Sequence, residues 1–413
     1  MDYNSTINLP KTDFSMRAGL PKKEPEILAR WYEMGLYERI MEKNEGRPTY
    51  LLHDGPPYAN GDIHLGHALN KSLKDFVVRY KNQSGFRSPY VPGWDTHGLP
   101  IESQVVAKLG IDRKGVSDAE FRRICAEFST RYIDNQRIQF KRLGVLGYWD
   151  KPYLTLSPDF EARQVEVFGE MAKRGYIYKG FKPVYWCPSD ETALAEAEIE
   201  YRDDTVMTVY AGLPVTDDLG RLFGPSGLDR IQVVIWTTAI WTLPASTCVT
   251  LGPDIEYGLY EKDGVGYLVA CEAAEQVLAL GGMPDARRVL TCKGADLVGV
   301  RVAHPIHDWD EPITVGDHVT AEDGTGCVHS AASAGPEDYE VYVQYKDRFP
   351  DMRILRVVDE YGKMTQEAGE PAAGLSVWDC GEPITRHLER QGRLFARRRF
   401  THAYPHCWRC HEP

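Results

Sequence analysis

The sequence contains no long apolar run and no excess of positive charge. Its 413 residues carry 60 acidic side chains against 48 Lys and Arg, a formal net charge of -12, and 43% are hydrophobic. The N-terminal stretch has no apolar segment of the kind found in signal peptides and carries Asp2 and Asp13. No window is apolar over the length that spans a bilayer. We therefore expect a cytoplasmic protein that contacts no membrane and does not coat nucleic acid nonspecifically.

The cysteines do not indicate a disulfide framework. Nine occur in the chain, and an odd number without a secretory signal predicts reduced thiols. Internal repeats and low-complexity tracts are absent too, which excludes a repeat architecture. With 26% charged residues, the composition is that of a folded protein, and the length suffices for two or three domains.

Helical patterns dominate the first part of the chain. Residues 1–48 predict a helical lead-in, with Glu24, Pro25 and Glu26 opening one helix. Residues 118–175 repeat apolar positions at helical spacing, and we expect both apolar stripes to face a core. The stripes consist of Phe121, Ile124, Cys125, Phe128, Tyr132 and Ile133, and of Phe160, Val165, Val167, Phe168 and Met171.

The stretch 50–71 holds the densest set of candidate functional residues. Apolar residues at 50–52, followed by Gly, Pro and Asn at 55–61, predict a buried strand that ends in a tight turn. A helix is predicted from Ala68 onward. The apolar positions that recur there at helical spacing are Leu69, Leu73, Phe76, Val77 and Tyr80. The segment His-Leu-Gly-His, residues 64–67, therefore falls in the first turn of that helix.

That position gives His64 and His67 a chemical role. Free backbone N–H groups and the helix dipole attract anionic oxygen to a first helical turn, and Gly66 lets a phosphate approach the backbone. The two imidazoles would add donors for charge that develops during phosphoryl or adenylyl transfer. Alternatively, both histidines cap and pack an ordinary helix. The turn before them and the run 93–100 after them favour the nucleotide site.

Residues 52–102 resemble the nucleotide-binding half of a class I aminoacyl-tRNA synthetase. The runs HDGPPYANGDIHLGHALNK (53–71) and GWDTHGLPIE (93–102) are similar to the isoleucine-specific branch of this family in particular. The resemblance implies an α/β fold with a Rossmann-like doubly wound parallel sheet. It also implies ATP and isoleucine as substrates, Mg2+ as cofactor, tRNA(Ile) as partner, and a monomeric full-length enzyme.

The same resemblance assigns roles to single residues. The residues expected to bind ATP are Asn60, His64, Gly66 and His67, the two histidines being catalytic as well. Gly55 and Pro56 would shape the amino-acid pocket, and the Asp95 carboxylate would hold the substrate ammonium by a charge-assisted bond. Asp95 has capping of a turn as its alternative role. His97 and Glu102 are expected to support the site or the fold.

A second, mostly β domain is predicted within residues 194–400 and is expected to be inserted into the first. Gly, Pro and Asp turns there separate predicted strands at 206–210, 231–236, 257–260, 267–270 and 353–358. The expected organisation is a helical lead-in at 1–48, the first catalytic half at 49–193, the insertion at 194–400, and a return to the catalytic domain at 401–413.

Parts of the insertion resemble the editing domain of the same family, which hydrolyses valine wrongly attached to the tRNA. The similar runs are 236–246, 324–331 and 335–339. A missing methylene is worth only about 1 to 3 kcal/mol in an apolar pocket, isoleucine against valine being the established example, so a second sieve is needed. The resemblance implies that Asp338 holds the ammonium of the misattached residue and that His329 lines the pocket. Hydroxyls that position the ester or its attacking water would come from Thr237, Thr238 and Thr242.

The insertion departs from the family pattern at three places. Ala239 stands where a third Thr is common, and Ser246 stands where Asn is common. Residues 332–334, ending in Ala334, replace a Pro-Gly-His run and remove a bulky polar wall. We expect editing to persist through Asp338 and Thr238, in a pocket of altered shape.

Two cysteine knuckles predict a metal site. Cys407 and Cys410 form a CxxC, and Cys187 with Asp190 forms a near match upstream. Paired knuckles bring four ligands around Zn2+, and an Asp oxygen can replace one thiolate. His406 or His411 would be a substitute ligand. The alternative is a turn with free thiols.

Gly362-Lys363-Met364-Thr365 is superficially similar to the family's ATP-binding lysine loop, but its place in the insertion predicts a hairpin turn. Neither a KMSKS-type loop nor an anticodon-binding domain is expected in the 413 residues. A half-sheet within 50–190 would expose apolar edges, which predicts aggregation or pairing with another chain.

Three functions are open: the N-terminal portion of an isoleucine-tRNA ligase, which we favour, a free-standing hydrolase of mischarged tRNA, or a binding module without turnover.

Overall fold

The structure is a computed structural model that describes residues 3–8, 13, 18–218 and 223–413. The chain divides into two compact units, residues 1–179 and 180–413. The predicted functional segments 1–48, 49–193, 194–400 and 401–413 stay predictions. No helix in the described part of the chain is long and apolar enough to cross a membrane.

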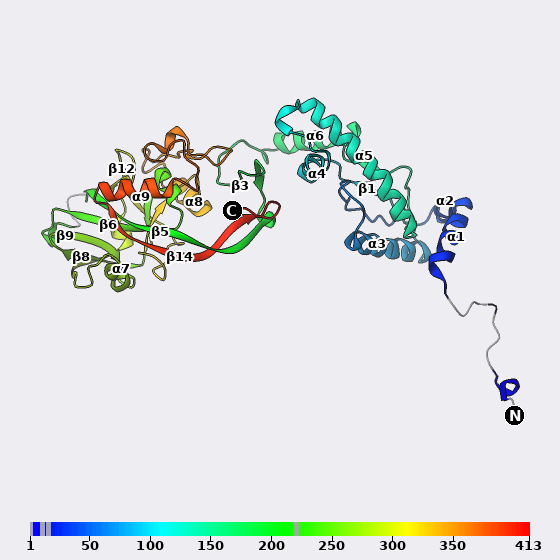
Figure 1. Ribbon diagram of the computed structural model, residues 1–413, viewed down its shortest axis with the longest axis horizontal. Helices are drawn as coiled ribbons and strands as arrows, with labels where there is room; N and C mark the ends of the chain where they lie inside the picture. Colours follow the sequence, from blue (N-terminus) through cyan, green and yellow to red (C-terminus); the bar gives the residue numbers. More distant parts are fainter. Residues whose placement is uncertain (1–2, 9–12, 14–17, 219–222) are drawn as a thin grey trace. The chain divides into compact units, whose positions relative to one another are not determined.

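The first unit is mainly helical and contains a short parallel sheet (Figure 1). Its elements are α1 (Leu20–Glu33), α2 (Leu36–Lys43), α3 (Leu65–Gln83), β1 (Gly93–Trp94), α4 (Leu99–Leu109), α5 (Asp118–Arg142), β2 (Tyr153–Leu154) and α6 (Pro158–Lys173). β1 pairs in parallel with β2, and isolated parallel bridges join Thr49 to Arg87 and Tyr58 to Asp95. The expected α/β class is confirmed, and its parallel pairing in this unit is limited to short contacts.

The predicted buried strand at 50–52 is wrong. The Tyr50 N–H donates to the Arg87 carbonyl, but pairing stops there, and Leu51 is 72% exposed. Pro56 and Pro57 follow closely and have no N–H with which to continue a ladder. The segment is therefore an extended chain that leads directly into the turn before α3.

α1 and α2 lie within the segment predicted as a helical lead-in. α1 begins at Leu20 and holds Pro25 in its interior, so its predicted start at Glu24 is too late. The stripe of α5 is confirmed as core, because Phe121 and Phe128 are buried. The stripe of α6 is wrong, since that helix has no buried residue and Phe168 is 59% exposed.

α3 buries its polar side and not its apolar stripe. Leu69 and Phe76 are each 63% exposed. The buried positions are Lys71, Asp75, Val78 and Asn82. The polar members are tied down: Lys71 pairs with Asp54, and the carboxylate of Asp75 accepts from the Leu146 N–H. Periodicity predicts the helix correctly but does not reveal which side is covered.

The second unit is built on one large mixed sheet with helices beside it. Its strands are β3 (Tyr185–Cys187), β4 (Thr192–Leu194), β5 (Ile199–Asp217), β6 (Ile231–Thr237), β7 (Cys248–Leu251), β8 (Glu256–Lys262), β9 (Val265–Ala270), β10 (Arg287–Lys293), β11 (Arg301–Ala303), β12 (Asp310–Val315), β13 (Cys327–Ser330) and β14 (Leu394–Cys407). Its α-helices are α7 (Ala274–Leu280), α8 (Pro336–Tyr345) and α9 (Gly381–Arg390). The mostly β character expected of this region is present.

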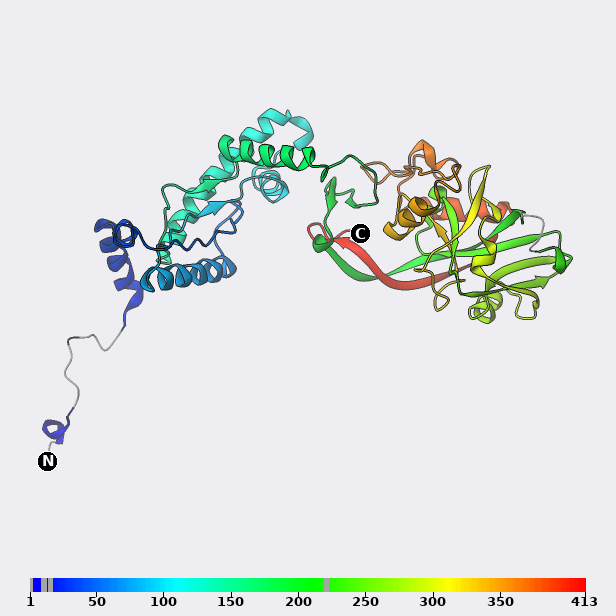
Figure 2. The same ribbon diagram turned by 180° about the vertical axis from the view of Figure 1, so that it is seen from behind.

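The 10-stranded sheet has the order β10-β8-β9-β6-β5-β11-β12-β7-β13, with β14 paired to β5. β6 with β9 and β7 with β12 are parallel, and the other pairs are antiparallel. Figures 1 and 2 show β5 and β14 side by side as a long ribbon, whose register runs from Ala211 opposite Leu394 to Ile199 opposite Cys407. The main apolar cluster of the core includes Val233, Leu259 and Ile313, and a smaller one includes Val341, Tyr345 and Met352.

The predicted strand at 353–358 is wrong. Most of its backbone hydrogen bonds go to side chains: the Arg353 carbonyl accepts from the Thr247 hydroxyl, and the Arg356 N–H donates to Glu367. Only its end pairs with backbone, where the Val357 carbonyl accepts from the Thr365 N–H. The hairpin turn predicted at 362–365 is present, with an antiparallel bridge between Val358 and Met364. Side-chain hydrogen bonds thus replace a ladder here.

Candidate functional site

The His-Leu-Gly-His segment begins α3, as its sequence predicts. His64 is the N-cap residue; its Nδ1 accepts from the Gly66 N–H at 3.0 Å, and the Nδ1 of His67 accepts from the His64 N–H at 3.3 Å. The two rings stack with their centroids 3.8 Å apart. A Cβ at Gly66 would lie 2.9 Å from the His64 ring, so glycine makes room for this geometry.

These hydrogen bonds fix the tautomers of both rings. Because each Nδ1 accepts a hydrogen bond, the proton of the neutral imidazole lies on Nε2. Burial, followed by the nearby His64 and Lys71, lowers the pKa of His67, which keeps that ring neutral near pH 7. Each Nε2–H is then a donor at the positive end of α3, an arrangement suited to phosphate oxygen.

Asp54 joins the segments that carry this site. It lies just before Gly55 and accepts hydrogen bonds from Lys71 and Lys74 of α3. The Gly93 N–H donates to the same carboxylate at 3.0 Å. Burial opposes its ionisation, but the charge and hydrogen bonds of Lys71 outweigh that effect, so the pKa of Asp54 lies below its ordinary value. The carboxylate therefore connects the turn, the helix and the strand before Asp95.

Asp95 lies beside the turn that precedes α3. Its N–H donates to the Pro57 carbonyl at 2.9 Å, and its carbonyl accepts from the Ala59 N–H at 3.0 Å. The half-buried carboxylate has long contacts to the His97 N–H at 3.5 Å and the Thr155 hydroxyl at 3.4 Å. A carboxylate held this weakly retains acceptor capacity for an ammonium group. The contact to His97 is the turn cap that the sequence also allows.

The remaining predicted residues of the first unit surround this turn. Gly55 is exposed and Pro56 is half-buried. The Asn60 amide donates to the Pro100 carbonyl at 3.1 Å, which ties the turn to α4. His97 pairs with Glu161 at 3.1 Å, and Glu102 lies in the first turn of α4. Both carboxylates thus lie on helices that flank the turn.

In the second unit, most of the predicted editing residues form one chain of hydrogen bonds. The Thr237 hydroxyl accepts from the Ala239 N–H at 3.1 Å, and the Ala239 carbonyl accepts from the Thr242 hydroxyl at 2.8 Å. The same Thr242 oxygen lies 2.9 Å from Nε2 of His329. Thr238 lies between Thr237 and Ala239 and is half-buried. The backbone of Ala239 therefore links two threonines, although its side chain lacks a hydroxyl.

This chain of bonds sets the state of His329. The single Thr242 proton goes to the Ala239 carbonyl, so Nε2 of His329 must donate and Nδ1 carries a bare lone pair. Burial lowers the pKa of His329 to about 4. Nδ1 is buried and has no hydrogen-bond partner among the described residues. The ring is therefore neutral, and its Nδ1 is a free acceptor.

Asp338 lies in the first turn of α8. Its Oδ2 accepts from the Ala331 N–H at 2.9 Å, and burial raises its pKa. Ala331 is two positions beyond His329, so Asp338 is linked to the same strand end. Ala334, where the family commonly has His, is exposed. The altered pocket wall stays a prediction.

The four predicted metal ligands converge. One ligand atom each from Cys187, Asp190, Cys407 and Cys410 lies within 4.8 Å of all the others. The Cys187 and Cys410 sulfurs are 3.5 Å apart, and the Cys407 sulfur lies 3.2 Å from an Asp190 oxygen. These separations approach the edges, about 3.5 Å long, of a tetrahedron of sulfur and oxygen ligands around Zn2+. The donor set fits that metal.

The two histidines considered as substitutes bind elsewhere. His406 bonds to the Tyr404 carbonyl at 2.9 Å, and His411 contacts Glu200 and Arg202. Asp190 is therefore the fourth ligand candidate.

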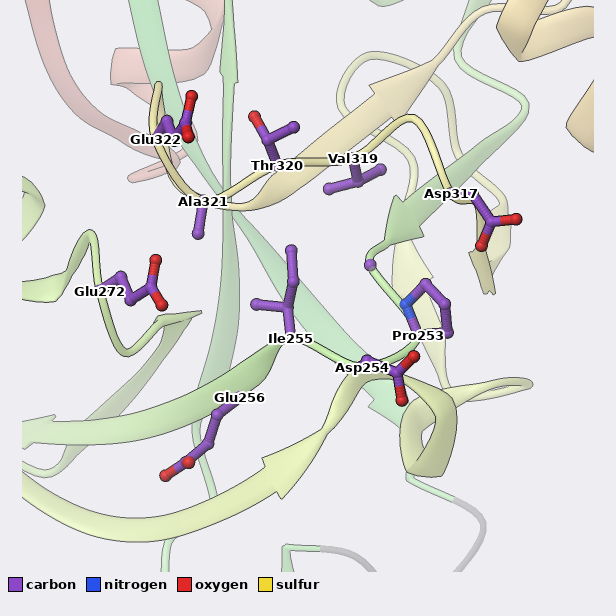
Figure 3. A pocket seen from close by; sticks show the side chains of 11 residues that line it. Pro253, Asp254, Ile255, Glu256, Glu272, Asp317, Val319, Thr320, Ala321 and Glu322 are labelled. Atoms are coloured by element: carbon purple, nitrogen blue, oxygen red, sulfur yellow. The ribbon is translucent and has the colours of Figure 1, made fainter.

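A separate hollow of about 630 Å³ lies beside the turn between β7 and β8 (Figure 3). Its lining is rich in carboxylates, including Asp254, Glu256, Glu272, Asp317 and Glu322. None of the predicted editing residues lines it. The predicted editing residues therefore occupy a different part of this unit.

Comparison with known proteins identifies the family of the chain. The family model described as tRNA synthetases class I (I, L, M and V) matches residues 26–384. The chain belongs to the class I aminoacyl-tRNA synthetases. It is 51% identical over 414 residues to the isoleucine–tRNA ligases of Caldanaerobacter subterraneus subsp. tengcongensis and Thermoanaerobacter sp. (strain X514). It is 50% identical over 413 residues to that of Geobacillus thermodenitrificans.

These matches cover 100% of this synthetase chain, which spans 43–44% of the length of those relatives. Among solved structures, GlLeuRS-CP1 aligns with a TM-score of 0.38 and 15% identity, covering 48% of this chain and 100% of that one. The Agrobacterium radiobacter K84 agnB2 LeuRS-tRNA-LeuAMS complex aligns with a TM-score of 0.39 and 17% identity, covering 96% and 52%.

The sequence did not point to every buried polar residue near these predicted sites. Asp54 lies inside the recognised motif, yet no pattern predicted that it pairs with α3. Glu311 on β12 is 2% exposed and accepts from the Ser246 hydroxyl at 3.0 Å. A single Glu among turn residues predicts a solvent-facing position, so the sequence gives no signal that Glu311 is buried. Its burial results from the pairing of β12 with neighbouring strands.

Proposed function

We propose that this chain supplies the nucleotide- and amino-acid-binding half and the editing site of an isoleucine-tRNA ligase. The observation that carries the proposal is the stacked pair His64 and His67, whose Nε2–H donors lie at the start of α3. Asp95 is tied by backbone hydrogen bonds to the turn that leads into the same helix. The identity of about half to isoleucine–tRNA ligases supports isoleucine as the amino acid.

In the proposed adenylation, the isoleucine carboxylate attacks the α-phosphorus of ATP and pyrophosphate leaves. Asp95 holds the ammonium of isoleucine, with Gly55 and Pro56 beside it. The imidazole donors stabilise negative charge on the phosphate oxygens as it develops. Mg2+ neutralises phosphate charge when it is bound with ATP, and Asn60 and Gly66 shape the turn around the nucleotide.

In the proposed editing reaction, water attacks the ester carbonyl of valyl-tRNA(Ile), releasing valine and the free tRNA end. Asp338 holds the ammonium of valine. The lone pair of His329 Nδ1 accepts from a hydroxyl or water at the ester, while Thr242 fixes the ring. Thr237 and Thr238 supply further hydroxyls at the end of β6.

We also propose that Cys187, Asp190, Cys407 and Cys410 hold a structural Zn2+. Their convergence and donor chemistry support this assignment. The metal would clamp β3 against the end of β14. A cytoplasmic location and a monomeric full-length enzyme remain part of the proposal.

Two assays on the 413-residue chain test the function. Isoleucine-dependent exchange of pyrophosphate into ATP reports adenylation, and release of valine from valyl-tRNA(Ile) reports editing. Deacylation without exchange would support the free-standing hydrolase, which the self-contained core of the second unit favours. Binding of ATP or tRNA without either reaction would reduce the chain to a binding module.

A further inference from the structure

The segment that follows β6 is anchored at its end by a buried pair. The 3-10 helix η5 (Ile240–Ala245) carries Thr242 and ends at Ser246. The Ser246 hydroxyl donates to Oε1 of Glu311 at 3.0 Å, and the two residues are 3% and 2% exposed. The next residue, Thr247, donates its N–H to the Ser330 carbonyl at 2.7 Å. The end of η5 is thus fixed between β12 and β13.

Glu311 forms no ion pair among the described residues. Burial lowers the pKa of His304, beside Ser246, to about 2, and burial raises the pKa of the Cys248 thiol on β7 to about 12. His329 on β13 is neutral as well. The Arg393 guanidinium donates to the His304 carbonyl at 2.7 Å and not to Glu311. Burial raises the pKa of Glu311 itself to about 8, with only the Ser246 hydrogen bond opposing it, so the carboxyl group is protonated at neutral pH.

Unpartnered polar atoms gather around η5. Oε2 of Glu311 and Nδ1 of His329 are both buried without a hydrogen-bond partner among the described residues. The two residues are 2% and 6% exposed. Buried polar atoms usually have a hydrogen-bond partner. Both side chains bond to η5 or to its C-cap, Ser246, so they lie beside the predicted editing residues.

We propose that Glu311 is a positioning residue of the editing site, acting through Ser246 to hold η5, and with it Thr242 and His329, in place. This inference rests on the proposed editing function. A protonated carboxyl group offers both an acceptor and a donor, and Oε1 of Glu311 accepts from the Ser246 hydroxyl. Glu311 thus fixes, from β12, the residue that follows η5.

The test uses three variants of the whole chain. E311Q keeps the acceptor for Ser246 and cannot ionise, E311L keeps similar bulk without any acceptor, and D310N changes the exposed neighbour on β12 as a control. Amide hydrogen exchange across residues 238–247 is measured by mass spectrometry. E311L should exchange about 10-fold faster in this segment, while E311Q and D310N match the unaltered chain. Unchanged exchange in E311L would overturn the proposal.

The second measurement is the rate of valyl-tRNA(Ile) deacylation between pH 6 and 9. E311L should lower kcat about 10-fold with little change in KM. The deacylation rate of the unaltered chain, divided by that of E311Q, should fall above pH 8, because Glu311 can ionise and the glutamine of the variant cannot. A ratio that does not change with pH would overturn the proposed role of the Glu311 proton. If the unaltered chain does not deacylate at all, the editing function fails, whereas hydrogen exchange still decides whether Glu311 holds η5.

Discussion

Lys71 and Asp54 form an ion pair in which both side chains are almost fully enclosed, with 2% and 0% exposed. Breaking a buried pair by removing one charge leaves the other unpaired, at a cost of about 3–5 kcal/mol. We predict that Asp54→Asn destabilises the first unit by that order, measured by urea unfolding of the chain. Asp134→Asn, which alters an exposed pair with Arg137, is the control and should change stability by less than about 1 kcal/mol.

The same carboxylate predicts sensitivity to acid. The pKa of Asp54 in the folded state lies below its ordinary value, which applies to the unfolded chain. The contribution of Asp54 to the free energy of unfolding is therefore complete above the pKa of the unfolded chain. It is lost as the pH falls through the pKa of the folded state. The difference in stability between the unaltered chain and Asp54→Asn should therefore shrink below pH 4. A difference that stays constant down to pH 2 would contradict the ionised pair.

Removal of either imidazole at the start of α3 should weaken ATP binding. His64→Ala and His67→Ala each delete one donor to phosphate, worth about 1.5–3 kcal/mol, so each should raise the Kd about 10-fold or more. Isothermal titration of the chain with ATP and Mg2+ measures this. His411→Ala, an exposed histidine in the second unit, should leave the Kd unchanged. Equal affinity in all the variants would argue against the nucleotide site.

Asp338→Ala should abolish most of the editing activity. Without the carboxylate the ammonium of valine is unpaired, and we expect deacylation of valyl-tRNA(Ile) to fall by at least about 100-fold. Glu337→Ala changes the exposed neighbour on α8 and should retain the activity. Rates that do not differ between Asp338→Ala and the unaltered chain would remove Asp338 from the site.

Zinc content tests the cysteine cluster. Protein purified in the presence of Zn2+ and then washed with a weak chelator should retain one metal per chain, measured by plasma mass spectrometry. Cys410→Ser should lose it, and Asp190→Cys should hold it more tightly, because thiolate suits Zn2+ better than carboxylate. Cys271→Ser is the control, since that cysteine lies outside the cluster. A washed chain without metal would end the assignment.

Glu311 predicts a pH dependence of stability with the opposite sign to that of Asp54. Its folded pKa is about 8, above the ordinary value, so the folded state retains a proton that the unfolded state releases. The contribution of Glu311 to the free energy of unfolding is complete below about pH 4.5 and declines as the pH rises to about 8. Relative to the unaltered chain, Glu311→Gln should gain stability across that window, by an amount of order 4 kcal/mol at its upper end. Parallel pH profiles would contradict the buried, protonated acid.

The sequence predicted best where a motif fixes local geometry. His64 to His67 began a helix as expected, because capping by the two side chains is a short-range effect. The same periodicity did not predict that Leu69 and Phe76 are exposed. The spacing of apolar residues shows that they share one side of a helix, but it does not show whether other elements pack on that side. Segment 353–358 has a strand-like pattern, but a hydrogen bond from the Thr247 hydroxyl and one to the Glu367 carboxylate take the place of most of a ladder. The burial of Glu311 could not be predicted from the sequence, because it depends on pairing between strands that are far apart in the chain.

The ladder between β5 and β14 places Ile199 directly opposite Cys407. Neighbouring strands lie about 5 Å apart, and two antiparallel strands at that spacing can be joined by a two-residue turn. The chain between Ile199 and Cys407 therefore begins and ends at nearly the same place. A tight hairpin would therefore suffice to rejoin the chain if the residues between these two positions were removed.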